Sequence, residues 1–339
     1  MLNIAVIGAG YWGRNHIRVY KELQREGMLN CLKICDIDSH HAEQVANSFG
    51  IEYVTDYRII AEDPEIQAVS IVTPSSTHYQ LGKELMEAGK DVLIEKPMTM
   101  DIGEAEQLVN TAAHSGRILM AGHIFRYHAA LQELKRRIDR GELGKIQNLV
   151  SNRLHFGIPR QDMGVIYALG IHELDTFCYL LGVNYPEGLM VIASSSYGHN
   201  IEETAMLAVD FGRTKGYALE SWLVPTYGKR RDLVVVGTER SARIDYLNPQ
   251  ELEMFDIRLV TENGLPVRVE DEGKHTIQVP YAEPLKEELQ HFIFCVNSRQ
   301  KPMSDGTVGL RAVVMAQASL TASRVGRPVR FQKDSFLVE

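Results

Sequence analysis

Short runs of apolar residues alternate with amphipathic segments through the first third of the chain. A continuous apolar run is typical of a strand buried on both faces of a parallel sheet, and an apolar stripe at helical spacing is typical of a helix packed on that sheet. The predicted strands are Ile4–Ile7, Leu32–Cys35, Ala68–Val72, Val92–Ile94 and Ile118–Met120. The predicted helices are Trp12–Glu26, Ser39–Gly50 with Ser39 as its cap, Ser76–Ala88 and Asp101–His114. This alternation predicts a doubly wound parallel sheet with helices on both faces.

The pattern changes after Gly122, where predicted strands follow one another with few helices between them. These strands are Ile146–Leu154, Leu189–Ser196, Thr204–Phe211, Gly216–Trp222, Arg231–Val236 and Ser241–Tyr246. Turn-forming residues at Gly212–Thr214 and Asn263–Gly264 favour hairpins, so we expect a mostly antiparallel sheet. The accompanying helices are predicted at Ala129–Arg140, Val165–Leu181, Pro284–Asn297 and Val308–Arg324.

The length of the chain indicates two domains, because 339 residues exceed what one hydrophobic core usually serves. The predicted fold class is α/β. An N-terminal doubly wound parallel sheet occupies residues 1–122, and a C-terminal α+β domain with a large, open, mostly antiparallel sheet occupies residues 123–339. The last two helices are free to pack back on the first domain.

Charge and composition narrow the choice of partners. A formal net charge of −8 argues against nucleic acid or an anionic membrane as a general partner. The four cysteines form no C-x-x-C pair, and His40–His41 lacks nearby carboxylates, so we expect neither a disulfide framework nor a metal site. No apolar run approaches the ~20 residues that span a bilayer, and the N-terminus predicts a strand rather than a signal peptide. A cytoplasmic location is therefore expected.

The sequence Gly8–Ala9–Gly10–Tyr11–Trp12–Gly13 joins the first predicted strand to the first predicted helix. In that setting G-x-G-x-x-G is the phosphate-binding fingerprint of the Rossmann fold. The first glycine allows a tight turn, the second lets the backbone approach a pyrophosphate, and the third lets helix and strand pack closely. We therefore expect a dinucleotide to bind at this turn, beside Tyr11 and Trp12.

An acidic residue at the end of the second predicted strand indicates which dinucleotide binds. Asp36 stands there, about twenty residues after the glycine turn. A carboxylate at this position accepts hydrogen bonds from the ribose hydroxyls and repels a 2′-phosphate, so NAD is favoured over NADP. Asp38 is the alternative residue for this role.

Two more loops follow predicted strands at the same edge of the sheet. Thr73, Pro74 and His78 follow one strand, and Glu95–Lys96–Pro97 follows the next. Ligands of doubly wound sheets bind at the carboxyl ends of the strands, so both loops are expected to face the cofactor. The Lys96 ammonium is the candidate to hold a substrate hydroxyl and lower its pKa. His78 is either a ligand contact or a polar residue at a helix start.

Together these three motifs resemble the glucose-fructose oxidoreductase/inositol dehydrogenase (Gfo/Idh/MocA) family. The stretch Gly164–Asp175 is similar to a helix motif in the second domain of that family, and the closing helices also fit. The resemblance implies an NAD-binding Rossmann domain and a second domain whose open sheet often mediates oligomerisation, and hence a homodimer or homotetramer. Within the family, Gly122–Tyr127, Gly164–Tyr167 and Ser221–Pro225 resemble UDP-N-acetylglucosamine 3-dehydrogenase-type members, which implies a nucleotide-sugar substrate.

The same resemblance assigns a proton-transfer residue. His172 occupies the position of the catalytic histidine of the family, and an imidazole suits a general base because it titrates near neutrality. Many members carry an aspartate four residues earlier, on the same helix face, where this chain has Ala168. Asp175 remains as a residue that could orient the imidazole.

Arginines near the predicted entrance of the second domain are candidates to bind a diphosphate, because guanidinium groups bind phosphate oxygens in pairs. They are Arg126, Arg153 and Arg160. Ordinary surface arginines are the alternative interpretation of all three.

Three functions are therefore weighed. The leading one is an NAD-dependent oxidation of a secondary ring hydroxyl of a sugar, such as C3 of UDP-N-acetylglucosamine, to a ketone. The second is an inositol or monosaccharide dehydrogenase of the same family. The third is a protein that senses NAD and sugar without turnover. Ala168 favours this alternative, because it replaces the aspartate that many family members carry.

Overall fold

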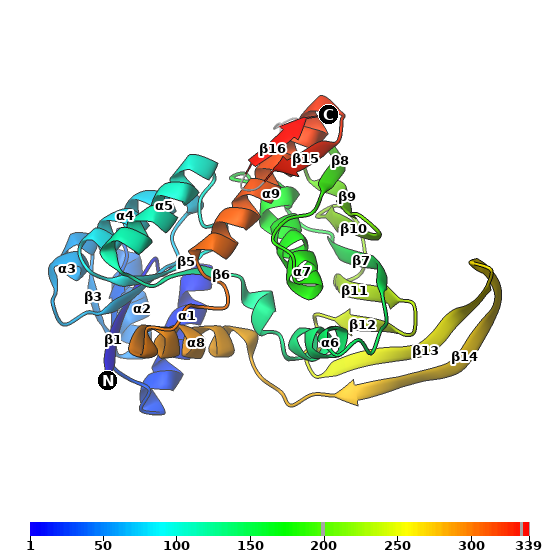
Figure 1. Cartoon of the computed structure of the whole chain (residues 1–339). Coiled ribbons are helices and arrows are strands. Elements are labelled where there is room, and N and C mark those ends of the chain that lie inside the picture. Colours follow the sequence, from blue (N-terminus) through cyan, green and yellow to red (C-terminus); the bar gives the residue numbers. More distant parts are fainter. Residues whose placement is uncertain (198–200, 333–334, 339) are drawn as a thin grey trace. The chain divides into compact units, whose positions relative to one another are not determined.

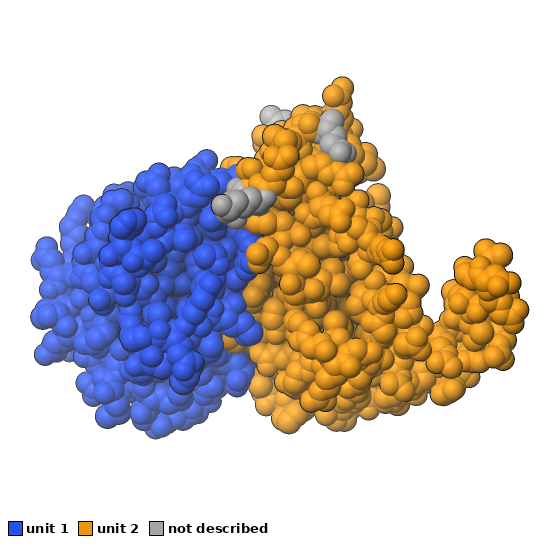
Figure 2. Space-filling model, in the orientation of Figure 1, with its two compact units in different colours: residues 1–124, 283–313 blue, residues 125–282, 314–339 orange. Residues whose placement is uncertain are grey.

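The computed structural model describes residues 1–197, 201–332 and 335–338 (Figure 1). The chain forms two compact units, coloured separately in Figure 2. Unit 1 comprises Met1–Ile124 and Glu283–Val313, and unit 2 comprises Phe125–Ala282 and Val314–Glu339. The chain thus returns to unit 1 late in the sequence and then ends in unit 2.

Unit 1 is built on a six-stranded parallel sheet with the order β3-β2-β1-β4-β5-β6. Its strands are β1 (Leu2–Ile7), β2 (Leu29–Cys35), β3 (Glu52–Val54), β4 (Ala68–Ile71), β5 (Asp91–Glu95) and β6 (Leu119–Gly122). Every residue of β4 and β5 is buried, as the continuous apolar runs predict for strands covered on both faces. The order reverses between β1 and β4, and ligands of such sheets bind at that reversal. The predicted doubly wound parallel sheet is confirmed.

The helices of unit 1 connect these strands. They are α1 (Tyr11–Arg25), α2 (Ser39–Phe49), α3 (Tyr57–Glu62), α4 (His78–Glu87), α5 (Ile102–Ser115), α8 (Pro284–Ser298) and the first part of α9 (Gly306–Val325). Helix α8 lies against α1, because Arg18 of α1 donates to Glu283 and Lys286 donates to Glu26 at 2.6 Å. A segment from the end of the sequence therefore completes the first unit.

Local details of unit 1 differ from the sequence-based expectation. Ser39 was predicted to cap the second helix, but Asp38 is the cap, because its carboxylate accepts from the backbone N–H of His41 at 3.0 Å. A 3-10 turn, Ser75–Thr77, precedes α4. Strand β3 and helix α3 were not predicted, since each is too short to show a period.

Unit 2 is built on a ten-stranded sheet with the order β14-β13-β12-β11-β7-β10-β9-β8-β15-β16. Its strands are β7 (Ile146–His155), β8 (Gly188–Ser194), β9 (Thr204–Phe211), β10 (Thr214–Ser221), β11 (Lys229–Gly237), β12 (Ser241–Asp245), β13 (Glu251–Glu262), β14 (Leu265–Gln278), β15 (Val329–Gln332) and β16 (Ser335–Val338). Neighbouring strands pair antiparallel except β7 and β10, which pair parallel. The predicted mostly antiparallel sheet is confirmed.

The strands β13 and β14 form a long hairpin that extends beyond its neighbours (Figure 1). Asn263 and Gly264 make its two-residue turn with φ angles of 50° and 81°, which confirms the predicted turn. The strands themselves were not predicted, because charged residues interrupt their alternation. Arg258 and Glu270, for example, pair across the hairpin.

Helices cover one face of this sheet. They are α6 (Ala129–Asp139), α7 (Ile171–Leu181) and the second part of α9. Phe177 of α7 packs over Gly216 of β10, where a Cβ atom would come within 2.8 Å of the ring. The Sγ atom of Cys178 lies 3.7 Å from the Sδ atom of Met315, which joins α7 to α9. Apolar side chains that remain exposed on the strands include Val150, Met190, Ile192, Met206 and Tyr217.

Candidate active site

The glycine turn after β1 has the geometry that a pyrophosphate requires. Gly8 has a φ of +94°, which side chains rarely allow, and a Cβ on Gly13 would lie 1.9 Å from the carbonyl oxygen of Gly8. A Cβ on Gly10 would meet nothing within 4 Å, so open space lies where a phosphate is expected. Gly10 is the N-cap of helix α1 and makes no side-chain hydrogen bond to it, so the first N–H groups and the positive dipole end of the helix face that space.

The different surroundings of these glycines predict different effects of the same substitution. We expect Gly13→Ala to destabilise unit 1 by about 3 kcal/mol or more, because backbone must move. Gly10→Ala should change the free energy of unfolding by no more than about 1 kcal/mol, because Gly10 has φ −62° and ψ −166° and its Cβ is free. It should still weaken NAD binding by at least about tenfold. Thermal unfolding and calorimetric titration with NAD would measure both, and unchanged NAD affinity in Gly10→Ala would exclude this turn as the phosphate site.

Asp36 lies beside the glycine turn, as predicted. Its Oδ2 accepts from the backbone N–H of Ala9 at 2.7 Å, and its Oδ1 accepts from the N–H of Asp38 at 3.0 Å. The His41 Nε2–H donates to the carbonyl oxygen of Ala9 at 2.7 Å. Both sides of Ala9 are therefore fixed, which holds the turn and the carboxylate in one arrangement. Sequence reasoning considered His41 only as a metal ligand and missed this contact.

Glu95, at the end of β5, is the buried anchor of the loop that carries Lys96. Its Oε1 accepts from Trp12 Nε1 at 2.7 Å and lies 3.0 Å from His16 Nε2, and its Oε2 accepts from the backbone N–H of Lys96 at 3.1 Å. Burial by itself would raise the pKa of Glu95. The contacts of His16 and Trp12 and the charge of Lys96 outweigh burial and hold that pKa below its ordinary value. The carboxylate thus stays ionised next to the Lys96 backbone.

The predicted cofactor contacts of Trp12 and Glu95 therefore involve groups that already have partners in the protein. The Trp12 indole N–H and the Glu95 carboxylate bind each other, whereas Tyr11 is 87% exposed at the start of α1.

A second buried carboxyl, Glu288 of α8, lies near Glu95. Burial and the charge of Glu95 raise the pKa of Glu288 well above its ordinary value. The sequence analysis assigned no role to Glu288.

His78 connects the two other cofactor-side loops. It is buried, and its Nδ1 and Nε2 atoms lie 2.9 Å from the carbonyl oxygens of Pro97 and Thr73 respectively. Burial lowers the pKa of His78. Since both ring nitrogens face backbone oxygens, this side chain links the loops and offers neither nitrogen to a ligand. Of the two roles weighed for His78, the geometry supports the structural one.

His172 lies in the first turn of α7 and is 7% exposed. The edge of its ring meets Phe125, with ring centroids 4.8 Å apart and planes at 82°. A π-helical turn, Ile166–Gly170, precedes α7, so the single α-helix predicted from Val165 is wrong at its start. Ala168 lies in that turn, where the four-residue spacing of an α-helix does not apply. Single π-helical turns are frequent at functional sites.

The remaining candidates divide into two buried pairs and one exposed pair. Arg126 makes a bidentate ion pair with Asp175, with Nε–Oδ2 at 2.8 Å and Nη2–Oδ1 at 2.6 Å, and both residues are buried. Arg153 is buried against Glu173. Arg160 is exposed and pairs with Asp162. The guanidinium groups of Arg126 and Arg153 are paired with buried carboxylates, which disfavours the diphosphate contacts expected of them. Arg160 is the one of the three that faces solvent.

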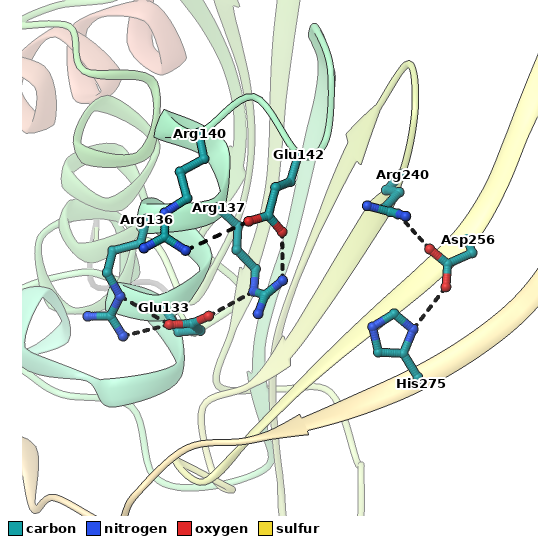
Figure 3. Close-up of polar contacts among 8 residues, drawn as sticks. All are labelled: Glu133, Arg136, Arg137, Arg140, Glu142, Arg240, Asp256 and His275. Atoms are coloured by element: carbon teal, nitrogen blue, oxygen red, sulfur yellow. Dashed lines mark hydrogen bonds and ion pairs between the residues drawn. The ribbon is translucent and has the colours of Figure 1, made fainter.

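A hollow lined in part by strands β13 and β14 does not form a second candidate site. It is lined by Glu142, Glu239, Arg240, Asp256, Arg258, Glu270 and Glu272. Ion pairs occupy most of these groups: Arg240 and His275 both bind Asp256, and Arg137 binds Glu142 (Figure 3).

Over residues 1–197, 201–332 and 335–338, no group of three or more histidines, cysteines or acidic residues could hold a metal ion. No helix among those residues is long and apolar enough to cross a membrane.

The fold and the loops of unit 1 are those of a dinucleotide-binding protein, and a second unit follows along the chain. Comparison with known proteins identifies the class. Residues 2–123 match the model of an oxidoreductase family with an NAD-binding Rossmann fold, and residues 131–243 match the GFO/IDH/MocA C-terminal domain. The chain belongs to the GFO/IDH/MocA family and is an NAD-binding oxidoreductase.

Individual relatives extend over nearly the whole chain. The scyllo-inositol 2-dehydrogenase (NAD(+)) of Bacillus subtilis is 28% identical, with 96% of this chain and 95% of that protein covered. The UDP-N-acetylglucosamine 3-dehydrogenase of Acidithiobacillus ferrooxidans is also 28% identical, with 93% and 95% covered. The solved structure of that enzyme aligns with a TM-score of 0.80 at 25% identity, over 96% of this chain and 98% of the other.

Proposed function

We propose that this protein is an NAD-dependent dehydrogenase that oxidises a secondary ring hydroxyl of a sugar to a ketone. The observation that carries the proposal is that one sheet edge holds three features together: a glycine turn with open space at Gly10, the Asp36 carboxylate, and Lys96, whose backbone N–H is held by the buried Glu95. The alcohol carbon loses a hydride, the hydroxyl loses a proton, and a ketone remains. When bound, the nicotinamide supplies the hydride acceptor.

The protein must supply the binding and the proton transfer. We assign the lowering of the hydroxyl pKa to the Lys96 ammonium and the acceptance of the proton to His172. The cofactor is assigned to Gly8, Gly10 and Gly13 at the pyrophosphate, to Asp36 at the ribose, and to the loops that carry Thr73 and Lys96. The exposed Tyr11 and Ile37 flank that site. Asp36 supports NAD rather than NADP, because its carboxylate would repel a 2′-phosphate.

The substrate is proposed to be a nucleotide sugar, with C3 of UDP-N-acetylglucosamine as the first candidate. The relative from Acidithiobacillus ferrooxidans supports this choice, and the exposed Arg160 offers a guanidinium for a diphosphate. An inositol is the second candidate, favoured by the equally similar relative from Bacillus subtilis. We also expect a cytoplasmic location. A homodimer or homotetramer is expected as well, supported by the exposed apolar strand residues of unit 2 and measurable by light scattering.

Initial rates of NAD reduction test the proposal. The purified protein would be incubated with NAD or NADP and with UDP-N-acetylglucosamine, other UDP-sugars, inositols and free monosaccharides, while the absorbance of the reduced nicotinamide is followed. We expect turnover with NAD and a UDP-sugar, and at least about tenfold lower kcat/KM with NADP. Turnover with inositols alone would select the second candidate. Binding of NAD and a sugar without any reduction would show a sensor instead of an enzyme.

A further inference from the structure

A stack of side chains in unit 2 leads from the sheet to the ring of His172. The Arg153 guanidinium carbon lies 4.0 Å from the ring centroid of Phe125 and 4.7 Å from that of Tyr246. The two aromatic rings are themselves in contact, with centroids 4.9 Å apart. Phe125 also contacts the ring of His172 edge to face, with ring centroids 4.8 Å apart. One planar cation therefore contacts the ring that in turn contacts the proposed base.

The ion-pair partner of Arg153 lies in the same helix turn as His172. The Nε–H of Arg153 donates to Glu173, the residue that follows His172 in the chain. Arg153 is 2% exposed and Glu173 is fully buried, so the pair is almost completely removed from water. A buried ion pair is a poor source of stability, since hydrophobic residues of similar volume often stabilise a fold equally well or better. Stability alone therefore gives little reason for an arginine at this position.

The neighbours of Arg153 in the sheet are charged as well. Pairing across the strands places Arg153 of β7 between Arg231 of β11 and Glu220 of β10. Glu220 is fully buried, and neither of its carboxyl oxygens has a hydrogen-bond partner in the protein. Burial and the charge of Glu173 raise the pKa of Glu220 well above its ordinary value. Arg153 and Glu220 are costly to bury, and the Arg153–Glu173 ion pair joins this row of polar residues to the turn that carries His172.

We propose that Arg153 is a positioning residue: its guanidinium plane, held by Glu173, fixes the ring of Phe125, and Phe125 fixes the ring of His172. The inference rests on the proposed function, in which His172 accepts the substrate proton. Arg153 touches no reacting atom and acts only through Phe125. A base must be held within a fraction of an ångström of its substrate, and a displacement of about 1 Å can cost about a hundredfold in rate.

Lysine and arginine are expected to behave differently at this position, and that difference tests the inference. Arg153→Lys keeps the positive charge next to Glu173 but removes the plane that contacts both rings. Phe125→Leu removes the ring while the ion pair stays intact. Arg153→Met with Glu173→Gln removes both charges together, so that no uncompensated carboxylate is left buried if a single variant fails to fold. Leu252→Ala, a fully buried site on β13 of the same sheet and outside the stack, is the control for lost stability.

Two measurements are made on each variant: kcat and KM on the substrate found above, and the histidine ring signals in NMR spectra, with His172 assigned by comparison with His172→Gln. We expect Arg153→Lys, the double variant and Phe125→Leu to lower kcat by at least about tenfold, to change KM by less than about threefold, and to shift the His172 ring signals. Phe125→Tyr should restore both properties. Leu252→Ala should lose thermal stability and keep both.

The inference is overturned if the folded Arg153→Lys protein keeps the wild-type kcat and His172 signals, or if Leu252→Ala changes them equally. The spectra also separate the two proposals. If no sugar is oxidised by the wild-type protein but the His172 signals still respond to Arg153→Lys, the proposed function fails while the positioning of the ring by Arg153 stands.

Discussion

Lys96→Met is expected to lower kcat by about 10²–10⁴-fold while NAD binds within about threefold of the wild-type affinity. The reason is the place of Lys96 in the fold rather than its charge alone. Lys96 follows β5 at the carboxyl edge of the parallel sheet, next to the strand order reversal where ligands of this fold bind. Methionine keeps the length and the apolar stem of the side chain but cannot hold or polarise a hydroxyl.

The backbone under Lys96 should survive this substitution. Its N–H donates to Glu95, whose carboxylate is held by Trp12 and His16, and none of these contacts involves the lysine side chain. Removing the ammonium also removes one charge that lowers the pKa of Glu95, so a modest loss of thermal stability is expected as well. The predicted rate loss is far larger than such a change in stability could produce.

Steady-state rates and calorimetric NAD titrations of Lys96→Met would be compared with those of Lys83→Met. Lys83 lies on α4 of the same unit and pairs with Glu87 at 2.6 Å on an exposed surface, where ion pairs contribute little. Its loss should leave kcat unchanged. Full turnover by Lys96→Met would show that the proposed mechanism is wrong.

The sequence predicted the parts of the structure that depend on nearby residues. The glycine turn, Asp36 and the Glu95–Lys96–Pro97 loop each lie within one strand–turn–helix segment, and a parallel sheet brings the carboxyl ends of its strands to one edge. Their placement in unit 1 therefore followed from motif and periodicity. The hairpin turn at Asn263–Gly264 was equally local, because both residues tolerate a positive φ.

The sequence failed where a residue's partner comes from a distant segment. Arg153 was expected to bind a diphosphate because a single arginine on a strand gives no sign of Glu173 or of the rings of Phe125 and Tyr246. Arg126 and Asp175 looked like two separate candidates until folding paired them. The π-helical turn before α7 could not be foreseen either, since its residues fit an α-helix in periodicity. Long-range pairing of polar groups is thus the information that the one-dimensional pattern lacks.

His172→Gln is expected to lower kcat by about 10²–10⁴-fold, with KM within about threefold. A general base must be unprotonated to accept the substrate proton, so the wild-type rate should fall as the pH drops through the pKa of the base. Glutamine cannot be protonated in that range, and the acid limb of the pH–rate profile should therefore disappear in the variant. The residual rate reflects binding and the contribution of Lys96.

The control for this prediction is His275→Gln, which removes an exposed imidazole paired with Asp256 on the β13–β14 hairpin (Figure 3). That variant should keep the wild-type kcat and the whole pH profile.

The two residues assigned to proton handling belong to different units, so the pair Lys96→Met and His172→Gln also tests whether they act in one reaction. Groups that act as a unit are far from additive: the double variant should be little slower than the slower single variant. Losses that multiply would show two independent effects and contradict a shared proton-transfer step.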